Sequence, residues 1–464
     1  MQQNRTLAQI LVGLIISLGF AHIQANAQTP APGTPAAIQQ QIDQLRQQLD
    51  QLEQVQKIAA RQKELADEAA ATKAKTAAFV SADTTGFNIK SNDGDFTLKI
   101  GADVQIDSRS PFGTGAGPLS DSILLRRVRP TFSGAIYKNI DYFIRPDFGQ
   151  GTVVLYEAYA ELKYFSRFKL RVGKFKPPVG LERLQSDDDT TFVERGLPTL
   201  LVPSRDTGFQ LSGDIIQGRA NYAVGVFNGV PDNGLADVAP STHRDFAGRI
   251  FLTPFAPTEN NPLKGLGFGM GASSGSVDGQ ALPAYKTFGQ NNFLTFASGV
   301  TEAGHRTRLA PQAYFYSGPL GILTEYGLTE EGLQKGNFRT DVAFRAWHVE
   351  TSYILTGEKK AFTSPTPRHI FDPAHGGWGA WELGFRLGGF SADKALFNDG
   401  LASYNNAARE VRERVGAVNW YLNRLFKVGL DFGNTSFGGG NTAALGGNRN
   451  QEKIVILRFQ INFI

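Results

Sequence analysis

The sequence contains no cysteine among its 464 residues, which excludes disulfide bonds, thiol catalysis and cysteine-ligated metals. Beyond the N-terminal region it also lacks any apolar run long enough to cross a bilayer as a helix. The formal net charge is only +4, from 47 basic and 43 acidic side chains, so no basic excess indicates nucleic-acid binding. These absences leave two fold classes, a soluble protein or a β-barrel, because barrel strands alternate in polarity instead of running apolar.

Motifs for catalysis and metal binding are missing too. The six histidines are scattered, with no H-x-x-x-H pair, and no G-x-S-x-G sequence occurs. The acidic run 187–189 lacks the spaced ligands and the distal glutamate of an EF-hand, so we predict a solvated loop there. We therefore expect no catalytic residue, no metal site and no cofactor.

The N-terminal region has the pattern of an export signal. Arg5 precedes the apolar run 10–20, and Ala25-Asn26-Ala27 supplies a small-residue cleavage site. We predict a signal peptide over 1–27, cleaved before Gln28, and a linker over 28–37. The alternative, a short membrane anchor, is less favoured because the run is short and a cleavage site follows it. A lipoprotein anchor is excluded because no cysteine follows the run.

Residues 38–77 contain neither glycine nor proline and are rich in Gln, Ala, Lys, Glu and Leu. Their apolar residues are spaced 4, 3, 4 and 3 apart, which is the heptad seam of a short coiled coil. A single solvated helix or a disordered spacer is the alternative. The seam consists of Ile38, Ile42, Leu45, Leu49 and Leu52.

From residue 79 to residue 464 the texture changes to segments of about ten residues that alternate between apolar and polar, as strands with two different faces do. In the last segment, for example, Leu457 and Phe459 alternate with Arg458 and Gln460. In a soluble sandwich the apolar face would point inward, whereas in a membrane barrel it would meet lipid and the polar face would line a wet lumen. The export signal, the aromatic residues at strand ends and the final strand favour an all-β transmembrane antiparallel barrel.

Several segments resemble the phosphate-selective porin O/P family. The resemblance implies a 16-stranded barrel, usually trimeric, whose long third loop folds into the pore as a constriction loop. It lies in the order and spacing of motifs across 79–464, since each motif alone is weak. The segments are Arg126-Arg127, Leu170–Arg183, Phe192–Gly196, Arg205–Gly208, Tyr353–Glu358, Trp378–Gly384 and Val418–Tyr421.

Strand parity predicts which cations face the lumen, because an arginine facing lipid at mid-membrane would cost about 2–4 kcal/mol. Guanidinium groups offer planar donor pairs that match phosphate oxygens. A basic lining of this kind could pass anions from site to site. The arginines predicted by parity are Arg127, Arg129, Arg145, Arg171, Arg219, Arg249, Arg306, Arg308 and Arg386.

The resemblance adds Arg195, which aligns with a constriction-loop arginine that contacts phosphate in relatives, and Arg183, which falls where a relative carries a lysine. It also matches Arg249 to an arginine on a barrel strand. The alternative for each arginine is a structural salt bridge inside the lumen, and Glu194 adjoins Arg195. Asp103 stands where a phosphate-selective relative has an arginine, which would weaken the attraction for anions.

We therefore expect a porin of the bacterial outer membrane, in contact with its lipid and with the N-terminal segment in the periplasm. It would be a homotrimer that passes small anions, such as inorganic phosphate or polyphosphate, by passive diffusion. A general, weakly selective porin is the alternative within transport. A barrel enzyme or an adhesin is the alternative outside it.

Overall fold

The computed structural model describes residues 33–84, 86–113, 121–216, 218–235, 237, 243–256, 258, 260–405, 407–439 and 451–463. The predicted signal peptide and the first residues of the predicted linker lie outside this description. The chain divides into two compact units, Met1–Ala77 and Ala78–Ile464. Among the described residues, no helix has both the length and the apolarity needed to cross a membrane.

The first unit contains the predicted helix, α2, which spans Pro35–Thr76. Proline suits its first turn, because a missing N–H group costs nothing there. The helix begins three residues before the predicted position and is confirmed, whereas its pairing with other copies stays a prediction. Leu45 and Leu49 on the heptad seam are 63% and 58% exposed in the single chain.

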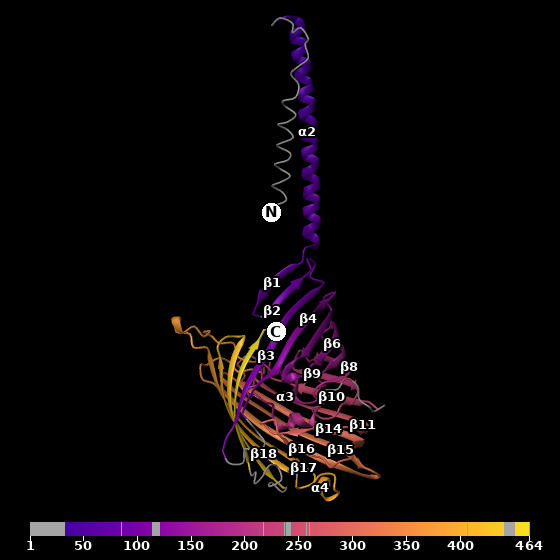
Figure 1. The fold of residues 1–464 in the computed structure, drawn as a ribbon, viewed down its shortest axis with the longest axis vertical. Helices are drawn as coiled ribbons and strands as arrows, with labels where there is room; N and C mark the ends of the chain where they lie inside the picture. Colours follow the sequence, from indigo (N-terminus) through magenta and orange to yellow (C-terminus); the bar gives the residue numbers. More distant parts are fainter. Residues whose placement is uncertain are drawn as a thin grey trace. The chain divides into compact units, whose positions relative to one another are not determined.

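The second unit is a closed barrel of sixteen antiparallel strands within the described residues, as predicted. The last strand pairs with β3 to close it, and Figure 1 shows the purple β3 beside the yellow C-terminal strand. The barrel strands are β3 (Thr97–Pro111), β4 (Ser122–Ile136), β5 (Ile140–Asp147), β6 (Val154–Phe165), β7 (Phe168–Phe175), β8 (Asp206–Ile215), β9 (Ala220–Phe227), β10 (Asp245–Leu252), β11 (Leu266–Gln280), β14 (Val300–Ser317), β15 (Leu320–Lys335), β16 (Phe338–Ile354), β17 (Ala380–Ala392), β18 (Glu410–Tyr421), β19 (Phe426–Gly438) and β20 (Gln451–Asn462).

Many strands are joined by tight turns at one end of the barrel, here called the turn end. Between β4 and β5, Tyr137 and Lys138 both have positive φ, which is typical of a type I′ hairpin turn. Two residues alone separate β6 from β7. At the opposite end, here called the loop end, longer connections leave β7, β9 and β11, and two of them carry short elements. α3 (Leu181–Leu184) and η2 (Leu197–Leu201) follow β7, and β12 (Tyr285–Lys286) and β13 (Asn292–Leu294) follow β11. Of the other short elements, η1 (Gly149–Gly151) lies between β5 and β6, η3 (Pro373–His375) between β16 and β17, and α4 (Ala395–Asn398) between β17 and β18.

A hairpin precedes the barrel and extends its seam. β1 (Phe79–Asp83) pairs with β2 (Gly86–Lys90), and β2 pairs with residues 97–100 of β3. β20 pairs with β3 only from residue 103 onward, so the hairpin covers the part of β3 that β20 leaves open.

The strands alternate as the sequence predicts. Phe459 is 51% exposed, whereas Ile456 and Arg458 on the same strand are buried. The outward face of β17 likewise carries the half-exposed Leu383 and Phe385. The large apolar side chains therefore lie on the outer surface, where a barrel meets lipid.

The inward face departs from the prediction of a wholly wet lumen. Along β16, β17 and β18, the inward Phe344, Phe390 and Val411 pack against the hairpin of β12 and β13 and against η2 and α4. Tyr285, at 0% exposed, stacks on Phe344 with ring centroids 5.1 Å apart. The connection between β11 and β14 thus folds inward and fills part of the lumen with an apolar core, because inward alternation does not require polar residues where a loop covers them.

Candidate functional site: the constriction loop and the basic lumen wall

The connection between β7 and β8, residues 176–205, is the constriction loop that the resemblance implied. It contains α3 and η2, and most of its side chains are buried inside the barrel. Leu181 packs with Phe251 and Leu323 of the wall, and Phe192 packs with Val415 and Ile456. The loop is therefore held at several points around the barrel.

Glu194 fastens the loop to three arginines of the wall. Its carboxylate accepts hydrogen bonds from Arg109 at 2.6 Å and from Arg126 at 2.7 and 3.1 Å, and Arg458 lies 3.5 Å away. Burial by itself would raise the pKa of the Glu194 carboxyl, but Arg126 and Arg109 together hold that pKa well below its usual range. Glu194 does not form the salt bridge with the adjacent Arg195 that the sequence offered as an alternative.

Asp187 corrects the expectation of a solvated acidic loop at 187–189. Its side chain is 3% exposed and forms ion pairs with Arg129 and Arg195, and it lies 3.6 Å from Arg127. The run is buried because the loop folds into the lumen, where wall arginines replace water as partners. Arg129 also binds Asp147 at 2.7 Å.

Arg195, the predicted central contact, is largely committed to the loop itself. Besides its ion pair with Asp187, it donates hydrogen bonds to the carbonyl oxygens of Glu182, at 3.0 Å, and Gln185, at 2.5 Å. It lines a pocket of about 280 Å³ on the loop-end side, together with Arg127, Arg129 and Arg183. The structure therefore brings four of the predicted arginines together there.

Of the other predicted arginines, three are buried in ion pairs with carboxylates. Two more donate hydrogen bonds to neutral oxygens, and one forms an ion pair that is partly exposed. Arg306 and Arg308 share Asp245, at 3.1 and 2.7 Å, and Arg386 binds Glu413 at 2.9 Å. Because a carboxylate neutralises each of these guanidinium groups, their contribution to an anion-attracting field is small. The remaining partners are Glu161 for Arg171, Thr131 for Arg145 and Gln312 for Arg249.

Contrary to the prediction from strand parity, Arg219 does not face the lumen. It lies in the turn between β8 and β9 and is exposed, so it does not sit on the inward face of a strand. The strand begins one residue later than parity assumed, at Ala220.

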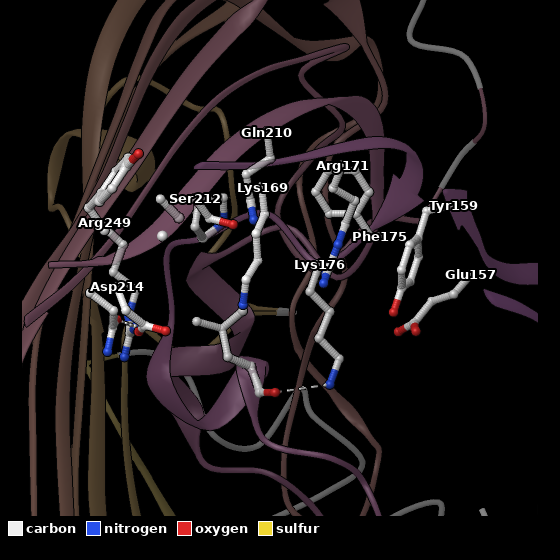
Figure 2. A pocket seen from close by; sticks show the side chains of 16 residues that line it. Glu157, Tyr159, Lys169, Arg171, Phe175, Lys176, Gln210, Ser212, Asp214 and Arg249 are labelled. Carbon is white, nitrogen blue, oxygen red and sulfur yellow. Dashed lines mark hydrogen bonds between the residues drawn. The ribbon is translucent and has the colours of Figure 1, made fainter. Parts of the chain in front are cut away.

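A second pocket, of about 380 Å³, lies on the lumen wall toward the turn end, below the start of the constriction loop. Figure 2 shows Lys169 between Arg249 on one side and Arg171 and Lys176 on the other. Of the ionisable groups that line it, these four are basic, whereas Glu157 and Asp214 are acidic. We call Lys169, Arg171, Lys176 and Arg249 the basic wall.

The basic wall differs from the paired arginines near the loop. Among the residues that the structure describes, Lys169, Lys176 and Arg249 form no ion pair with a carboxylate. Lys176 donates to the carbonyl oxygens of Gln185 at 2.8 Å and Leu184 at 3.3 Å, as Figure 2 shows for one of them. Burial, reinforced by repulsion from Arg205, holds the pKa of the Lys176 amine well below its ordinary range.

Lys169 and Lys176 were not predicted. Lys169 has the parity of Arg171, so strand alternation alone could have placed it in the lumen. Lys176 follows β7 directly, where no periodicity applies, and only the fold of the loop brings it to the wall.

A closed sixteen-stranded barrel with an inward-folded loop and a charged lumen is the architecture of an outer-membrane porin, a channel protein. The chain belongs to the family described as "Phosphate-selective porin O and P", whose sequence model matches residues 96–463. The predicted family is thereby confirmed.

Porin O of Pseudomonas aeruginosa is 24% identical over 379 residues, which cover 74% of this chain and 84% of that protein. The outer membrane channel DcaP of Acinetobacter baumannii is similar in structure, with a TM-score of 0.51 and 11% identity over 82% of this chain and 100% of that one. An anion-selective porin from Comamonas acidovorans has a TM-score of 0.50 and 12% identity over 79% and 100%. At such identities the structural likeness concerns the fold alone.

Proposed function

We propose that this porin prefers small anions, inorganic phosphate among them, and that the basic wall is where they are held during passage. The observation that carries the proposal is that three cations of the basic wall, Lys169, Lys176 and Arg249, have no carboxylate partner among the described residues. An unpaired cation in a water-filled lumen lowers the energy of a passing anion, whereas a paired one contributes little.

The guanidinium groups of the basic wall give the site a chemical preference as well as a charge. Arg249 donates through Nε to Gln312 at 2.8 Å, which leaves further N–H groups for a ligand oxygen. Ser212 and Gln210 of β8 add neutral hydrogen-bonding groups to the same lining. Phosphate oxygens accept from both kinds of group, so the pocket suits a hydrated oxyanion. The description of the family as phosphate-selective and the name of the anion-selective Comamonas porin agree with this choice.

We further propose that the protein works as a homotrimer with its turn end facing the periplasm. The exposed heptad seam of α2 supports the oligomer, because three such helices would bury their seams against one another. The order signal peptide, helix, barrel supports a periplasmic position for the helix.

A general, weakly selective porin is the second candidate. It is favoured by the seven predicted arginines that are already paired with carboxylates. Asp103, fully buried opposite Arg129 in the strand register, adds to the acidic side of the balance.

The two candidates are separated by the reversal potential of the purified protein in a planar bilayer with a KCl gradient. We expect a potential on the side of the chloride equilibrium potential, and a chloride current that falls when phosphate is added. A potential near zero with no effect of phosphate would favour the general porin. A potential on the potassium side would overturn the anion preference while leaving the porin class intact.

We expect the anion preference to weaken as pH rises. Lys176 has a pKa well below that of an ordinary lysine, so with rising pH it loses its proton, and with it its positive charge, before other lysines do. Reversal potentials measured at several pH values should reveal the loss.

The control is Lys176→Arg, which keeps its charge throughout the series and should flatten the pH profile. Lys176→Gln should show the weaker preference already at the lowest pH of the series. An unchanged profile in both variants would mean that Lys176 does not act on the permeating ion.

A further inference from the structure

Behind the constriction loop, three chemistry-bearing side chains meet in a buried cluster. Glu182 comes from α3 in the loop, whereas His348 and Glu350 stand two residues apart on the inward face of β16. The exposed fractions of their side chains are 1%, 0% and 9%. One ligand-type atom from each of the three lies within 4.8 Å of those of the other two.

His348 is the unexplained member. Neither of its ring nitrogens makes a hydrogen bond to any described residue, although the side chain is fully buried. Its Nδ1 lies 3.7 Å from a carboxylate oxygen of Glu182 and 3.8 Å from one of Glu350, too far for hydrogen bonds. A buried polar group left without a partner is costly, so the cluster is incomplete as it stands.

The charge of the cluster points the same way. Three buried carboxylates, those of Glu182, Glu350 and Glu413, surround one guanidinium, that of Arg386, which lies 2.9 to 3.8 Å from them. Lys360, the other amine acting on Glu350, is paired with Glu382 at 2.6 Å. With a neutral imidazole and three ionised carboxylates, these side chains together with Arg386 carry two excess negative charges in a buried place, which one divalent cation would neutralise.

We propose that Glu182, His348 and Glu350 bind one divalent cation of the zinc type, which ties the constriction loop to the barrel wall. Imidazole with two carboxylates is a ligand set that suits Zn²⁺ and its first-row neighbours. Ligand atoms on tetrahedral Zn²⁺ lie about 3.4 Å apart. The distances of 3.7 and 3.8 Å from His348 Nδ1 to the two carboxylate oxygens would therefore have to shorten by only a few tenths of an ångström.

Hydrogen bonds that would orient two of the ligands around such an ion are in place. The carboxylate of Glu182 accepts a hydrogen bond from the backbone N–H of Gly196 at 2.8 Å, and that of Glu350 accepts one from Arg386 at 3.3 Å. A Cβ on Gly196 would lie 2.0 Å from Nδ1 of His348, so only glycine lets the loop come this close to the ligand. The ion would thus join two segments of the loop to β16.

The test uses the full-length protein, extracted in detergent, stripped with a chelator and dialysed against Zn²⁺, with bound metal counted by elemental analysis. We expect one Zn²⁺ per chain in the wild type and loss of that ion in His348→Gln and Glu350→Gln. His305→Gln removes an exposed histidine of β14 and should keep the full stoichiometry. Co²⁺ in place of Zn²⁺ should give a visible absorption band that disappears with His348→Gln.

Wild-type protein that binds no stoichiometric metal would overturn the proposal, whatever the variants do. Equal binding by the wild type and both cluster variants would also overturn it, since the metal would then sit elsewhere. Glu350→Gln preserves the size of the side chain, so that a folding failure of His348→Gln would still leave a variant to compare. Measurements of anion preference do not enter this test, which stands apart from the proposed function.

Discussion

Replacing Lys169 and Arg249 by glutamate should reverse the proposed anion preference and make the channel prefer cations. The double change leaves two basic and four acidic groups in the pocket of the basic wall, the reverse of the present balance. A unit charge about 4 Å from an ion in water is worth about 1 kcal/mol, so two reversals exceed the energy of a tenfold change in permeability. The reversal potential in a KCl gradient should change sign, and more strongly at low salt, because screening is then weaker and each charge acts over a longer distance.

The matched control is the double variant Arg219→Glu and Lys264→Glu. It makes the same change of charge on one arginine and one lysine, but both side chains are exposed in turns outside the pocket. We expect a much smaller shift of the reversal potential, without a change of sign. Equal shifts in the two double variants would show that overall charge, and not the basic wall, sets the preference.

Glu194→Gln should loosen the constriction loop and raise the single-channel conductance. The substitution takes from the buried Arg109 and Arg458 and the half-buried Arg126 the carboxylate that they share. Breaking a buried ion pair from one side costs about 3–5 kcal/mol, enough to shift the loop toward conformations detached from the wall. Conductance in planar bilayers and thermal unfolding in detergent would measure the two effects, a wider and noisier channel and a lower midpoint.

Asp141→Asn is a suitable control because it also removes one carboxylate from an ion pair. Asp141 lies 2.6 Å from Lys163, but both side chains are about one third exposed, and surface pairs contribute about 0–1 kcal/mol. Conductance and unfolding should stay close to the wild type. If Glu194→Gln behaves in the same way, the loop is held by its apolar contacts and not by this carboxylate.

The pH dependence of the loop should be slight on the acidic side. The pKa of Glu194 is held well below the usual range, so the carboxylate stays ionised and paired as pH falls through the range where ordinary glutamates take up protons. The stability that it contributes is lost only at still lower pH, when its own depressed pKa is reached.

The fold could be predicted from the sequence because strand alternation is a local signal. On β20 the outward Leu457 and Phe459 and the inward Arg458 are each placed by parity alone, as the structure has them. Parity fails where a β-bulge interrupts the alternation of side chains. Between Gln105 and Ile106 of β3 the register with β4 shifts by one residue, so that Arg126 as well as Arg127 reaches the loop.

The partners of the lumen arginines could not be predicted, because they come from segments far away in the chain. Asp187 reads as part of an acidic surface run until the loop around it is folded into the barrel, where it meets Arg129. Asp232 likewise finds its partner only in the folded chain. It lies in the connection after β9 and forms an ion pair of 2.5 Å with Arg308. The sequence therefore located most of the lumen arginines, but neither lysine of the basic wall, and it could not say which cations are free.

The apolar filling along β16, β17 and β18 has a consequence for how an ion travels. Since Phe344, Phe390 and Tyr285 exclude water from that side, the aqueous route is eccentric and follows the opposite wall. Packed hydrocarbon is a poor dielectric, so it concentrates the field lines of Lys169 and Arg249 in the water that remains beside them. Each of these charges then acts on a passing solute more strongly than it would in a lumen filled with water across its whole width.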